Sequence, residues 1–333
     1  MINVAINGFG RIGRLVLKAG INNKNIRFVA VNDLTEPKTL AHLLKWDSVH
    51  GKFPGKVEAK NDSIVVNGKE IKITAEKDPS KLPWKKLKVD VVVESTGHFR
   101  TYDDCKLHIK AGAKKVVLSA PPKGDKPIKQ IVMGVNDKTY KGEDIVSNAS
   151  CTPNCFAPMA KVINDNYGII DGVMTTIHSY TNDQEILDSP HKDLRRARSA
   201  ALNIVPTSTG AAEAINEVIP ELSGKLIGSS IRVPTPDGSL CHFVAEIKGM
   251  RNKCVTEEVN SLFKKMAATK YKGIIEYSEE PLVSTDVIGN PNSCLFDSKL
   301  TTCVGNNLIV VAWYDNEWGY SNRMIDVIKL VMK

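Results

Sequence analysis

Residues 2–14 read INVAINGFGRIGR, which is an apolar run, a glycine-rich turn and the start of a helical pattern. Gly8, Gly10 and Gly13 form the pattern G-x-G-x-x-G at this turn. Asp33 follows 20 residues after Gly13, at the end of the next apolar run. Such glycines allow a tight turn, close approach of a pyrophosphate and close helix packing, and the acidic residue binds the adenosine ribose. A carboxylate there repels the extra phosphate of NADP, so the stretch predicts a dinucleotide site that prefers NAD.

The first 150 residues alternate strand-like and helix-like segments. Their Val- and Ile-rich runs are nearly continuous, which is typical of parallel strands buried on both faces. Asn67-Gly68 predicts a hairpin within residues 63–74. We expect strands at Ile2–Asn7, Arg27–Asp33, Lys88–Glu94, Lys115–Ser119 and Gln130–Val135, and helices at Arg11–Ala19, Thr39–Leu44 and Asp103–Ala111. The alternation predicts an α/β fold with a doubly wound, mostly parallel sheet.

The segments change character after residue 150. Strand-like runs now alternate polar and apolar residues, which is typical of an antiparallel sheet with one exposed face. We expect helices at 150–166, 210–219, 256–269 and 320–332, and strands at 172–178, 228–233, 240–249 and 308–314. A chain of 333 residues corresponds to about two domains. The sequence therefore predicts a second, α+β domain with a largely antiparallel sheet.

The composition restricts the classes of function. The net charge of +8 favours anionic partners, and phosphorylated metabolites satisfy it as well as nucleic acid does. No two of the seven cysteines have the C-x-x-C spacing of a zinc knuckle, so we expect no metal site. Arg11 and Arg14 lie where a signal peptide needs apolar residues, and no apolar run reaches the roughly 20 residues of a membrane span. We expect a cytoplasmic protein without a membrane partner.

Cys151 is the candidate nucleophile. It lies in SNASCTPNC (147–155), after an apolar strand end, and Pro153 suits a first helical turn. A helix N-terminus lowers the pKa of a thiol, and a nearby imidazole ionises it further, so we expect a mostly ionised Cys151. His178, at the end of the next strand, is the candidate partner. Cys155 follows one turn later and is interpreted as a buried helix residue.

Other polar residues occur where anions or a dinucleotide bind. Ser95, Thr96 and Ser119 follow apolar strands, and ligands bind along that sheet edge, although plain turns explain these residues equally well. Thr209-Gly210 opens a helix, and helix N-termini bind anions. Arginines at 195, 196, 198 and 232 can grip phosphate, although a solvated or subunit-facing loop also explains Arg195 and Arg196.

Seven motifs along the whole chain resemble the phosphorylating glyceraldehyde-3-phosphate dehydrogenase family. They are INGFGRIGR (6–14), SNASCTPNC (147–155), HSYTNDQ (178–184), PHKDLRRAR (190–198), TSTGAA (207–212), RVPTP (232–236) and WYDNEWGYSNR (313–323). The resemblance implies an NAD-dependent enzyme of glycolysis or gluconeogenesis that converts glyceraldehyde 3-phosphate and inorganic phosphate into 1,3-bisphosphoglycerate. It also implies a homotetramer, an NAD-binding domain of residues 1–150 plus the helix 317–333, and a catalytic domain of residues 151–316.

The resemblance also implies a role for each matching residue. Cys151 is the catalytic thiol that forms a hemithioacetal and then a thioester, and His178 is its base. The implied site of the substrate phosphate contains Thr181, Asp183 and Arg232, and the implied site of inorganic phosphate contains Ser150, Thr152, Arg198, Thr209 and Gly210. Further expected cofactor contacts are Arg11, Ile12, Lys77, Asn316 beside the nicotinamide carboxamide and Tyr320 beside its ring.

Three features depart from the family pattern, and two rival functions stay open. Pro153 replaces a common threonine, Asp237-Gly238 replaces a common Asn-Val, and Ser189 leaves open a modest use of NADP. One rival function is erythrose-4-phosphate dehydrogenase, which shares the Cys and His chemistry. The other is a binding role of the basic surface, for RNA or a protein, although no motif that combines aromatic and basic residues supports nucleic acid as a partner.

Overall fold

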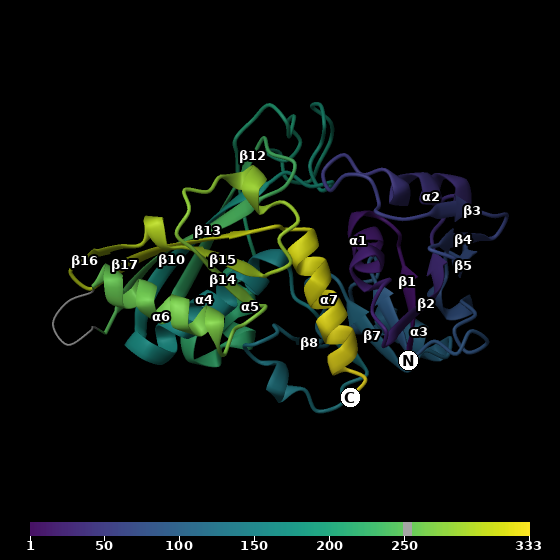
Figure 1. Cartoon of the computed structure of the whole chain (residues 1–333), viewed down its shortest axis with the longest axis horizontal. Helices are drawn as coiled ribbons and strands as arrows, with labels where there is room; N and C mark the ends of the chain where they lie inside the picture. Colours follow the sequence, from purple (N-terminus) through teal and green to yellow (C-terminus); the bar gives the residue numbers. More distant parts are fainter. Residues whose placement is uncertain (249–254) are drawn as a thin grey trace. The chain divides into compact units, whose positions relative to one another are not determined.

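The computed structural model describes residues 1–248 and 255–333 (Figure 1). Gly249, the expected end of one strand, lies outside the described residues. The chain divides into two compact units. Unit 1 comprises Met1–Ile131, Asp137–Ser150 and Ser321–Lys333, and unit 2 comprises Val132–Asn136 and Cys151–Tyr320. No helix among the described residues is long and apolar enough to cross a membrane.

Unit 1 contains a nine-stranded sheet with the strand order β3-β4-β5-β2-β1-β6-β7-β9-β8. Its strands are β1 Ile2–Asn7, β2 Ile26–Asn32, β3 Val57–Ala59, β4 Ser63–Val66, β5 Lys69–Thr74, β6 Val91–Glu94, β7 Lys115–Leu118, β8 Lys129–Gln130 and β9 Ile145–Ser147. The helices before residue 150 are α1 Arg11–Gly20, α2 Pro37–Lys45 and α3 Tyr102–Lys110. In this spatial order, every neighbouring pair of strands between β5 and β8 is parallel. The pairs β3 with β4 and β4 with β5 are antiparallel. The expected doubly wound, mostly parallel sheet is confirmed.

Local sequence signals explain several element ends in unit 1. Asn67 and Gly68 both have positive φ and close the expected hairpin between β4 and β5. Thr101 begins α3 with a capping box, because its Oγ1 accepts a hydrogen bond from Asp104 N at 3.1 Å and the Asp104 carboxylate accepts one from Thr101 N at 3.2 Å. Lys88 has φ +52°, so the expected strand 88–94 begins only at Val91.

The strand expected at Gln130–Val135 is wrong. Residues 130–135 were expected to be extended, but β8 ends at Gln130. The chain then turns, because Gly134 has φ +81° and the side chain of Asn136 accepts a hydrogen bond from Val132 N at 2.8 Å. An apolar run followed by a side-chain-closed turn has the same composition as a strand, so the pattern of residue types did not distinguish them.

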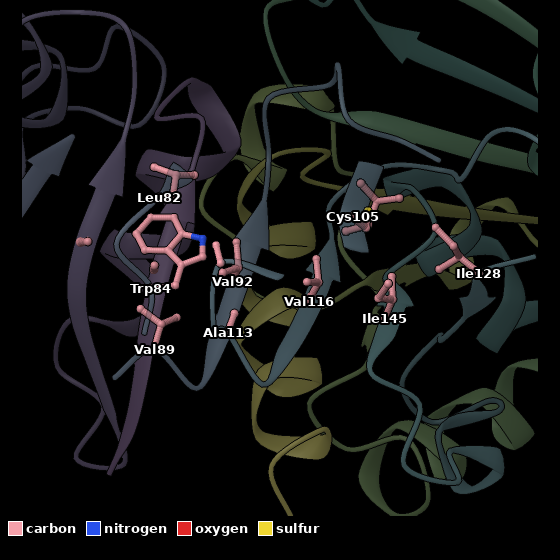
Figure 2. Close-up of a cluster of buried hydrophobic side chains, with 13 residues drawn as sticks. Leu82, Trp84, Val89, Val92, Cys105, Ala113, Val116, Ile128 and Ile145 are labelled. Carbon is pink, nitrogen blue, oxygen red and sulfur yellow. The ribbon is translucent and has the colours of Figure 1, made fainter. Parts of the chain in front are cut away.

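A cluster of thirteen buried residues forms one core of unit 1 (Figure 2). Val92 on β6, Val116 on β7 and Ile145 on β9 contribute to it, together with Cys105 on α3. Trp84 is the largest member and is fully buried. Burying a valine side chain contributes about 1.5–3 kcal/mol, so this layer holds α3 and the Trp84 segment on the parallel strands.

Unit 2 contains an eight-stranded sheet with the order β11-β12-β10-β13-β17-β15-β14, and β16 pairs with β17. Its strands are β10 Ile169–Ser179, β11 Val205–Thr207, β12 Leu226–Val233, β13 Ser239–Ile247, β14 Ile275–Ser278, β15 Cys294–Asp297, β16 Thr302–Val304 and β17 Asn307–Tyr314. The helices after residue 150 are α4 Cys151–Tyr167, α5 Ala211–Val218, α6 Thr256–Ala268 and α7 Trp318–Leu330. Among the described strands, only β10 with β12 and β14 with β15 pair parallel, so the largely antiparallel sheet is confirmed.

The two faces of the unit 2 sheet differ. The helix α4 packs on β10, β13, β15 and β17, and α5 packs on α4 (Figure 1). Met174 on β10 is therefore fully buried. Its neighbour Val173 points to the other face, beside Ile227 of β12, and these side chains are 42% and 66% exposed. The described chain thus leaves apolar residues of this second face uncovered.

Candidate active site

The glycine-rich turn joins β1 to α1 as the sequence predicts. Gly8 has φ +89°, and a Cβ there would collide with the backbone of Ser95 and Thr96. A Cβ on Gly13 would collide with the Gly8 carbonyl oxygen. Phe9 N donates to Asp33 Oδ2 at 2.8 Å, so the turn itself holds the strand-end carboxylate in place.

A cavity of about 380 Å³ opens beside this turn, at the carboxyl ends of the parallel strands. Six of the expected cofactor residues line it: Gly8, Gly10, Asp33, Lys77, Ser95 and Thr96. Six further lining residues were not expected: Asn7, Asn32, Leu34, Glu76, His98 and Phe99. Asn7 and Asn32 are the last residues of their strands. This strand-end position is the one feature of the sequence that could have predicted them as lining residues.

The cavity fits a dinucleotide. The N-cap residue of α1 is Gly10, which has no side chain to cap the helix, and a helix N-terminus attracts an anion such as a pyrophosphate. A Cβ at Gly10 would meet no protein atom within 4 Å, so the glycine leaves that space open. The Asp33 carboxylate lines the same cavity and has the chemistry to accept hydrogen bonds from ribose hydroxyls.

The other expected cofactor residues do not line this cavity. Arg11 Nη1 forms an ion pair with Asp47 Oδ1 at 3.1 Å. Ile12 lies in the first turn of α1, and Ser119 follows β7, where its N–H donates to the Glu94 carbonyl at 2.9 Å. Asn316 and Tyr320 belong to unit 2.

Cys151 is the first residue of α4, directly after a strained turn. Ala149 has φ +52° and is fully buried. The left-handed conformation of Ala149 redirects the chain from β9 into the helix, and it costs an alanine about 1 kcal/mol. Pro153 occupies the first turn as predicted, where its missing N–H is not needed.

Cys151 and His178 are in contact, as the sequence predicts. Cys151 Sγ lies 3.4 Å from His178 Nε2. His178 is at the end of β10, and its Nδ1 lies 2.7 Å from the carbonyl oxygen of Ser179. A carbonyl only accepts hydrogen bonds, so Nδ1 carries the ring proton and Nε2 presents its lone pair to the sulfur.

Burial controls the charge of this pair. It raises the pKa of the Cys151 thiol to about 11, although Arg232 and the hydrogen bond from Thr152 N act in the opposite direction. Burial lowers the pKa of His178 to about 3, and the charge of Arg232 lowers it further. Both shifts oppose the mostly ionised thiol that the sequence predicts and favour a neutral pair, in which charge develops as the proton moves from Sγ to Nε2.

Tyr314 connects the helix of Cys151 to the strand of His178. Its hydroxyl lies 2.9 Å from Thr152 Oγ1 and 2.9 Å from Thr176 Oγ1. Its ring meets the His178 imidazole edge to face, with centroids 5.9 Å apart. These contacts join residues far apart in the sequence, and no motif pointed to a structural role for Tyr314.

The residues expected to bind the substrate phosphate are partly brought together. Arg232 Nη1 donates to Thr181 Oγ1 at 3.2 Å and to the Ser179 carbonyl at 3.1 Å. Asp183 forms an ion pair with Arg196. Burial lowers the pKa of both Arg232 and His178, and the charge of Arg196 lowers both further. The charge of Arg196 therefore acts on His178 and Arg232, whereas the sequence left the role of Arg196 open.

The second expected anion site is less compact. Thr209 Oγ1 accepts a hydrogen bond from Ala211 N at 3.2 Å, and Gly210 precedes α5 as its N-cap. Arg198 instead pairs with Asp188, Nε to Oδ2 at 2.7 Å, and its side chain is 62% exposed. Ser150 immediately precedes Cys151, and Thr152 Oγ1 is bonded to Tyr314, so these two hydroxyls lie on either side of the thiol in the chain.

Asn316 has a fixed orientation. Its Oδ1 accepts a hydrogen bond from Ser239 Oγ at 2.6 Å, and Ser239 Oγ accepts one from Ser179 N at 3.0 Å. The Asn316 side-chain NH₂ is thus turned away from Ser239 and can donate to a carbonyl. Tyr320 lies in the first turn of α7 and is buried.

Comparison with known proteins identifies relatives of the whole chain. The family descriptions "Glyceraldehyde 3-phosphate dehydrogenase, NAD binding domain" and "Glyceraldehyde 3-phosphate dehydrogenase, C-terminal domain" match residues 2–102 and 150–316. Glyceraldehyde-3-phosphate dehydrogenase 1 of Bacillus subtilis is 54% identical over 335 residues, covering 100% of this chain and 98% of the relative. The enzyme of Thermotoga maritima is 55% identical over 337 residues, covering 100% of both chains. The enzyme of Geobacillus stearothermophilus is 53% identical over 329 residues, covering 98% of this chain and 97% of the relative.

Proposed function

Because the chain belongs to the glyceraldehyde-3-phosphate dehydrogenase family, we propose that it oxidises glyceraldehyde 3-phosphate to 1,3-bisphosphoglycerate with NAD and inorganic phosphate. The observation that carries the proposal is the contact of Cys151 Sγ with His178 Nε2 at 3.4 Å, with the His178 tautomer fixed by the Ser179 carbonyl. A thiol beside an imidazole lone pair is the arrangement needed for covalent catalysis on a carbonyl carbon.

In the proposed reaction, Cys151 attacks the aldehyde carbon as its proton passes to His178. His178 returns this proton to the aldehyde oxygen, which gives a hemithioacetal, and takes it again from the hydroxyl group during oxidation. Bound NAD supplies the hydride acceptor. The resulting thioester keeps the energy of the oxidation in a bond that phosphate can attack, and its cleavage releases an acyl phosphate.

We propose two anion sites in unit 2. Arg232 and Thr181, joined at 3.2 Å, suit the phosphate of the substrate, together with Asp183 and the adjacent Arg196. The turn of Thr209 and Gly210 at the start of α5 suits inorganic phosphate, since a helix N-terminus attracts anions. A phosphate held beside the thioester attacks it as an intramolecular nucleophile, which raises the rate. Ser150, Thr152 and Arg198 remain proposed members of that second site.

The domain roles follow from these sites. We propose that unit 1, with the glycine-rich turn, is the NAD-binding domain and that unit 2 is the catalytic domain. Asn316 and Tyr320 remain proposed contacts of the nicotinamide, and Arg11, Ile12 and Ser119 remain proposed contacts elsewhere along NAD. The support for Asn316 is its fixed amide, which can donate to the carboxamide oxygen.

We also propose a homotetramer in the cytoplasm. Val173 and Ile227 belong to an uncovered sheet face, and exposed apolar side chains also occur at Leu187, Leu194, Leu202 and Ile204. Exposed apolar side chains such as these are typical of subunit interfaces. A catalytic thiol stays reduced in a reducing compartment such as the cytoplasm, which supports this location. The mass of the intact chain in solution tests the tetramer.

The reaction is tested by NAD reduction with glyceraldehyde 3-phosphate, with and without inorganic phosphate, beside erythrose 4-phosphate. We expect sustained turnover only with phosphate, because without it the thioester is not released, and a preference for the three-carbon sugar. A preference for erythrose 4-phosphate would assign the chain to the related dehydrogenase. RNA binding that persists at saturating NAD would instead support a separate role of the basic surface, because RNA held in the cofactor site would be displaced.

Cofactor choice gives a second expected result. In Asp33→Gly, kcat/KM for NADP relative to NAD should rise by about 10-fold or more, because a carboxylate facing a 2′-phosphate costs several kcal/mol. The kcat/KM for NAD itself should fall, because Phe9 N also loses its hydrogen-bond acceptor. Steady-state kinetics with both cofactors measure the ratio. Asp62→Gly, at an exposed carboxylate on a different turn, is the matched control and should leave the ratio unchanged. An unchanged ratio in Asp33→Gly contradicts the role of Asp33 as the discriminator.

A further inference from the structure

We propose that Glu94 is a positioning residue for the cofactor: its carboxylate holds Asn7 and Thr96 of the cavity in one orientation before NAD binds. The inference rests on the proposed function, in which this cavity takes NAD. It concerns a residue that lies behind the cavity and that neither the glycine pattern nor the strand-end motifs pointed to.

Four neighbouring parallel strands each end on a polar residue. The register pairs Thr74 of β5 with Asn32 of β2, Asn32 with Asn7 of β1, and Asn7 with Glu94 of β6. We call Thr74, Asn32, Asn7 and Glu94 the sheet-edge row. The two asparagines line the cavity, whereas Glu94 is 0% exposed. The row therefore forms part of the cavity wall and of the layer behind it.

The orientation of both asparagines is fixed from the β5 side. Asn32 Nδ2 donates to the Glu76 carbonyl at 2.9 Å, and Asn32 Oδ1 accepts from Glu76 N at 2.9 Å. Because these are backbone groups with fixed roles, the Asn32 amide cannot rotate without losing both bonds. Asn32 Nδ2 also donates to Asn7 Oδ1 at 2.7 Å. The Asn7 NH₂ group must then face Glu94, and it donates to Glu94 Oε2 at 2.6 Å.

The other neighbours of Glu94 are donors as well. Trp84 Nε1 donates to His108 Nδ1 at 3.0 Å, so the proton of the neutral ring is on Nε2, which lies 2.9 Å from Glu94 Oε2. Thr96 donates to Glu94 Oε1 twice, from its N at 2.9 Å and from its Oγ1 at 2.5 Å. Four donors from three residues converge on one side chain. Only an ionised carboxylate, which has two acceptor oxygens and no proton, satisfies all of them.

This arrangement explains why a charge is buried here. A buried carboxylate without partners is strongly destabilising, but four donors offset its desolvation. An amide in its place would direct an NH₂ group toward either the Asn7 and His108 donors or the Thr96 donors. Asn7 cannot respond by rotating, because Asn32 is held by the Glu76 backbone. The mismatch would therefore displace side chains that line the cavity, and preorganisation for NAD would be lost.

The test is the Glu94→Gln variant, studied as the full chain. We expect its dissociation constant for NAD, measured by titration calorimetry without substrate, to rise by about 10-fold or more, because a hydrogen bond to a charged group is lost. At saturating NAD and substrate, kcat should stay within about twofold of the wild-type value, since the thiol and its base are untouched. This split between affinity and turnover is the readout that a general loss of stability does not produce.

Two further variants keep the test decisive. Val116→Ala lies in the same core cluster as Trp84 (Figure 2) and should lower thermal stability without changing the affinity for NAD. Trp84→Phe keeps an aromatic ring but removes the donor to His108, and it should weaken NAD binding by about threefold. It replaces Glu94→Gln as the measured variant if that chain does not fold.

The outcomes separate this inference from the proposed function. If the wild-type chain binds NAD and the folded Glu94→Gln variant binds it equally well, Glu94 is not a positioning residue. An equal loss of affinity in Val116→Ala overturns the inference too, because general destabilisation then explains the effect. If the wild-type chain does not bind NAD at all, the proposed function itself fails.

Discussion

The Cys151→Ser variant should reduce NAD on the order of 10⁴-fold more slowly than the wild-type chain, because the sulfur is the atom that bonds to the substrate. A serine hydroxyl holds its proton more tightly than a thiol, and His178 has a pKa of about 3 and is a weak base. The Sγ–Nε2 contact of 3.4 Å therefore suits a thiol and does not suffice for a hydroxyl. The measurement is the initial rate of NADH formation with saturating phosphate.

Cys155→Ala is the matched control for that loss. Cys155 lies on the same helix one turn later, is 0% exposed as the sequence predicted, and has its Sγ 3.9 Å from the Ala312 carbonyl. Its replacement removes packing but no reacting atom, so activity should remain near the wild-type level. NAD affinity should be unchanged in Cys151→Ser. A Cys151→Ser chain that keeps more than about one hundredth of the wild-type rate contradicts the assignment of the nucleophile.

The features that the sequence predicted depend on signals within a few residues. The turn at Gly8 needs positive φ and close approach to Thr96, and both demands are visible as a glycine. The hairpin at Asn67-Gly68 is visible for the same reason. The left-handed Ala149 before the nucleophile was not predicted, because alanine carries no such signal and tertiary packing imposes its conformation.

The contacts that support the site depend on pairing between distant strands. Asn7 and Glu94 lie 87 residues apart, and Thr152 and Tyr314 lie 162 residues apart. Each residue alone is a common strand-end or helix residue. Strand register brings Asn7 to Glu94, and the packing of α4 on β17 brings Thr152 to Tyr314. Likewise, the motif drew attention to Arg198, whereas the folded loop directs Arg198 to Asp188 and Arg196 to Asp183. The chemistry of the site was predictable, but the residues that orient it were not.

The charge of the pair also required the structure. A helix N-terminus and an imidazole predict an ionised thiol, because each lowers the pKa of a thiol that is accessible to solvent. In the folded chain, burial opposes ionisation and is the largest influence on Cys151 and on His178. His178 therefore acts as the acceptor of a proton that leaves the sulfur during attack, which makes its position as important as its basicity.

The His178→Asn variant tests that role, and we expect its kcat to fall by about 10²–10⁴-fold, the range typical of losing a general base. An asparagine NH₂ group can still donate to the Ser179 carbonyl, as Nδ1 does at 2.7 Å, but nothing then replaces Nε2 beside the sulfur. The thiol keeps its proton for longer, so alkylation of Cys151 by iodoacetamide should slow together with turnover. Both rates are measured on the same preparation.

The Tyr314→Phe variant distinguishes the loss of the base from a loss of the contacts that position it. This variant removes the hydroxyl between Thr152 and Thr176 but leaves the imidazole in contact with the thiol. It should lower kcat by less than about 10-fold, since it loosens positions without removing a reacting atom. Equal losses in the two variants would mean that His178 acts only by packing. A much larger loss in His178→Asn, with slower alkylation, supports a proton acceptor at Nε2, because Tyr314→Phe leaves Nε2 beside the sulfur.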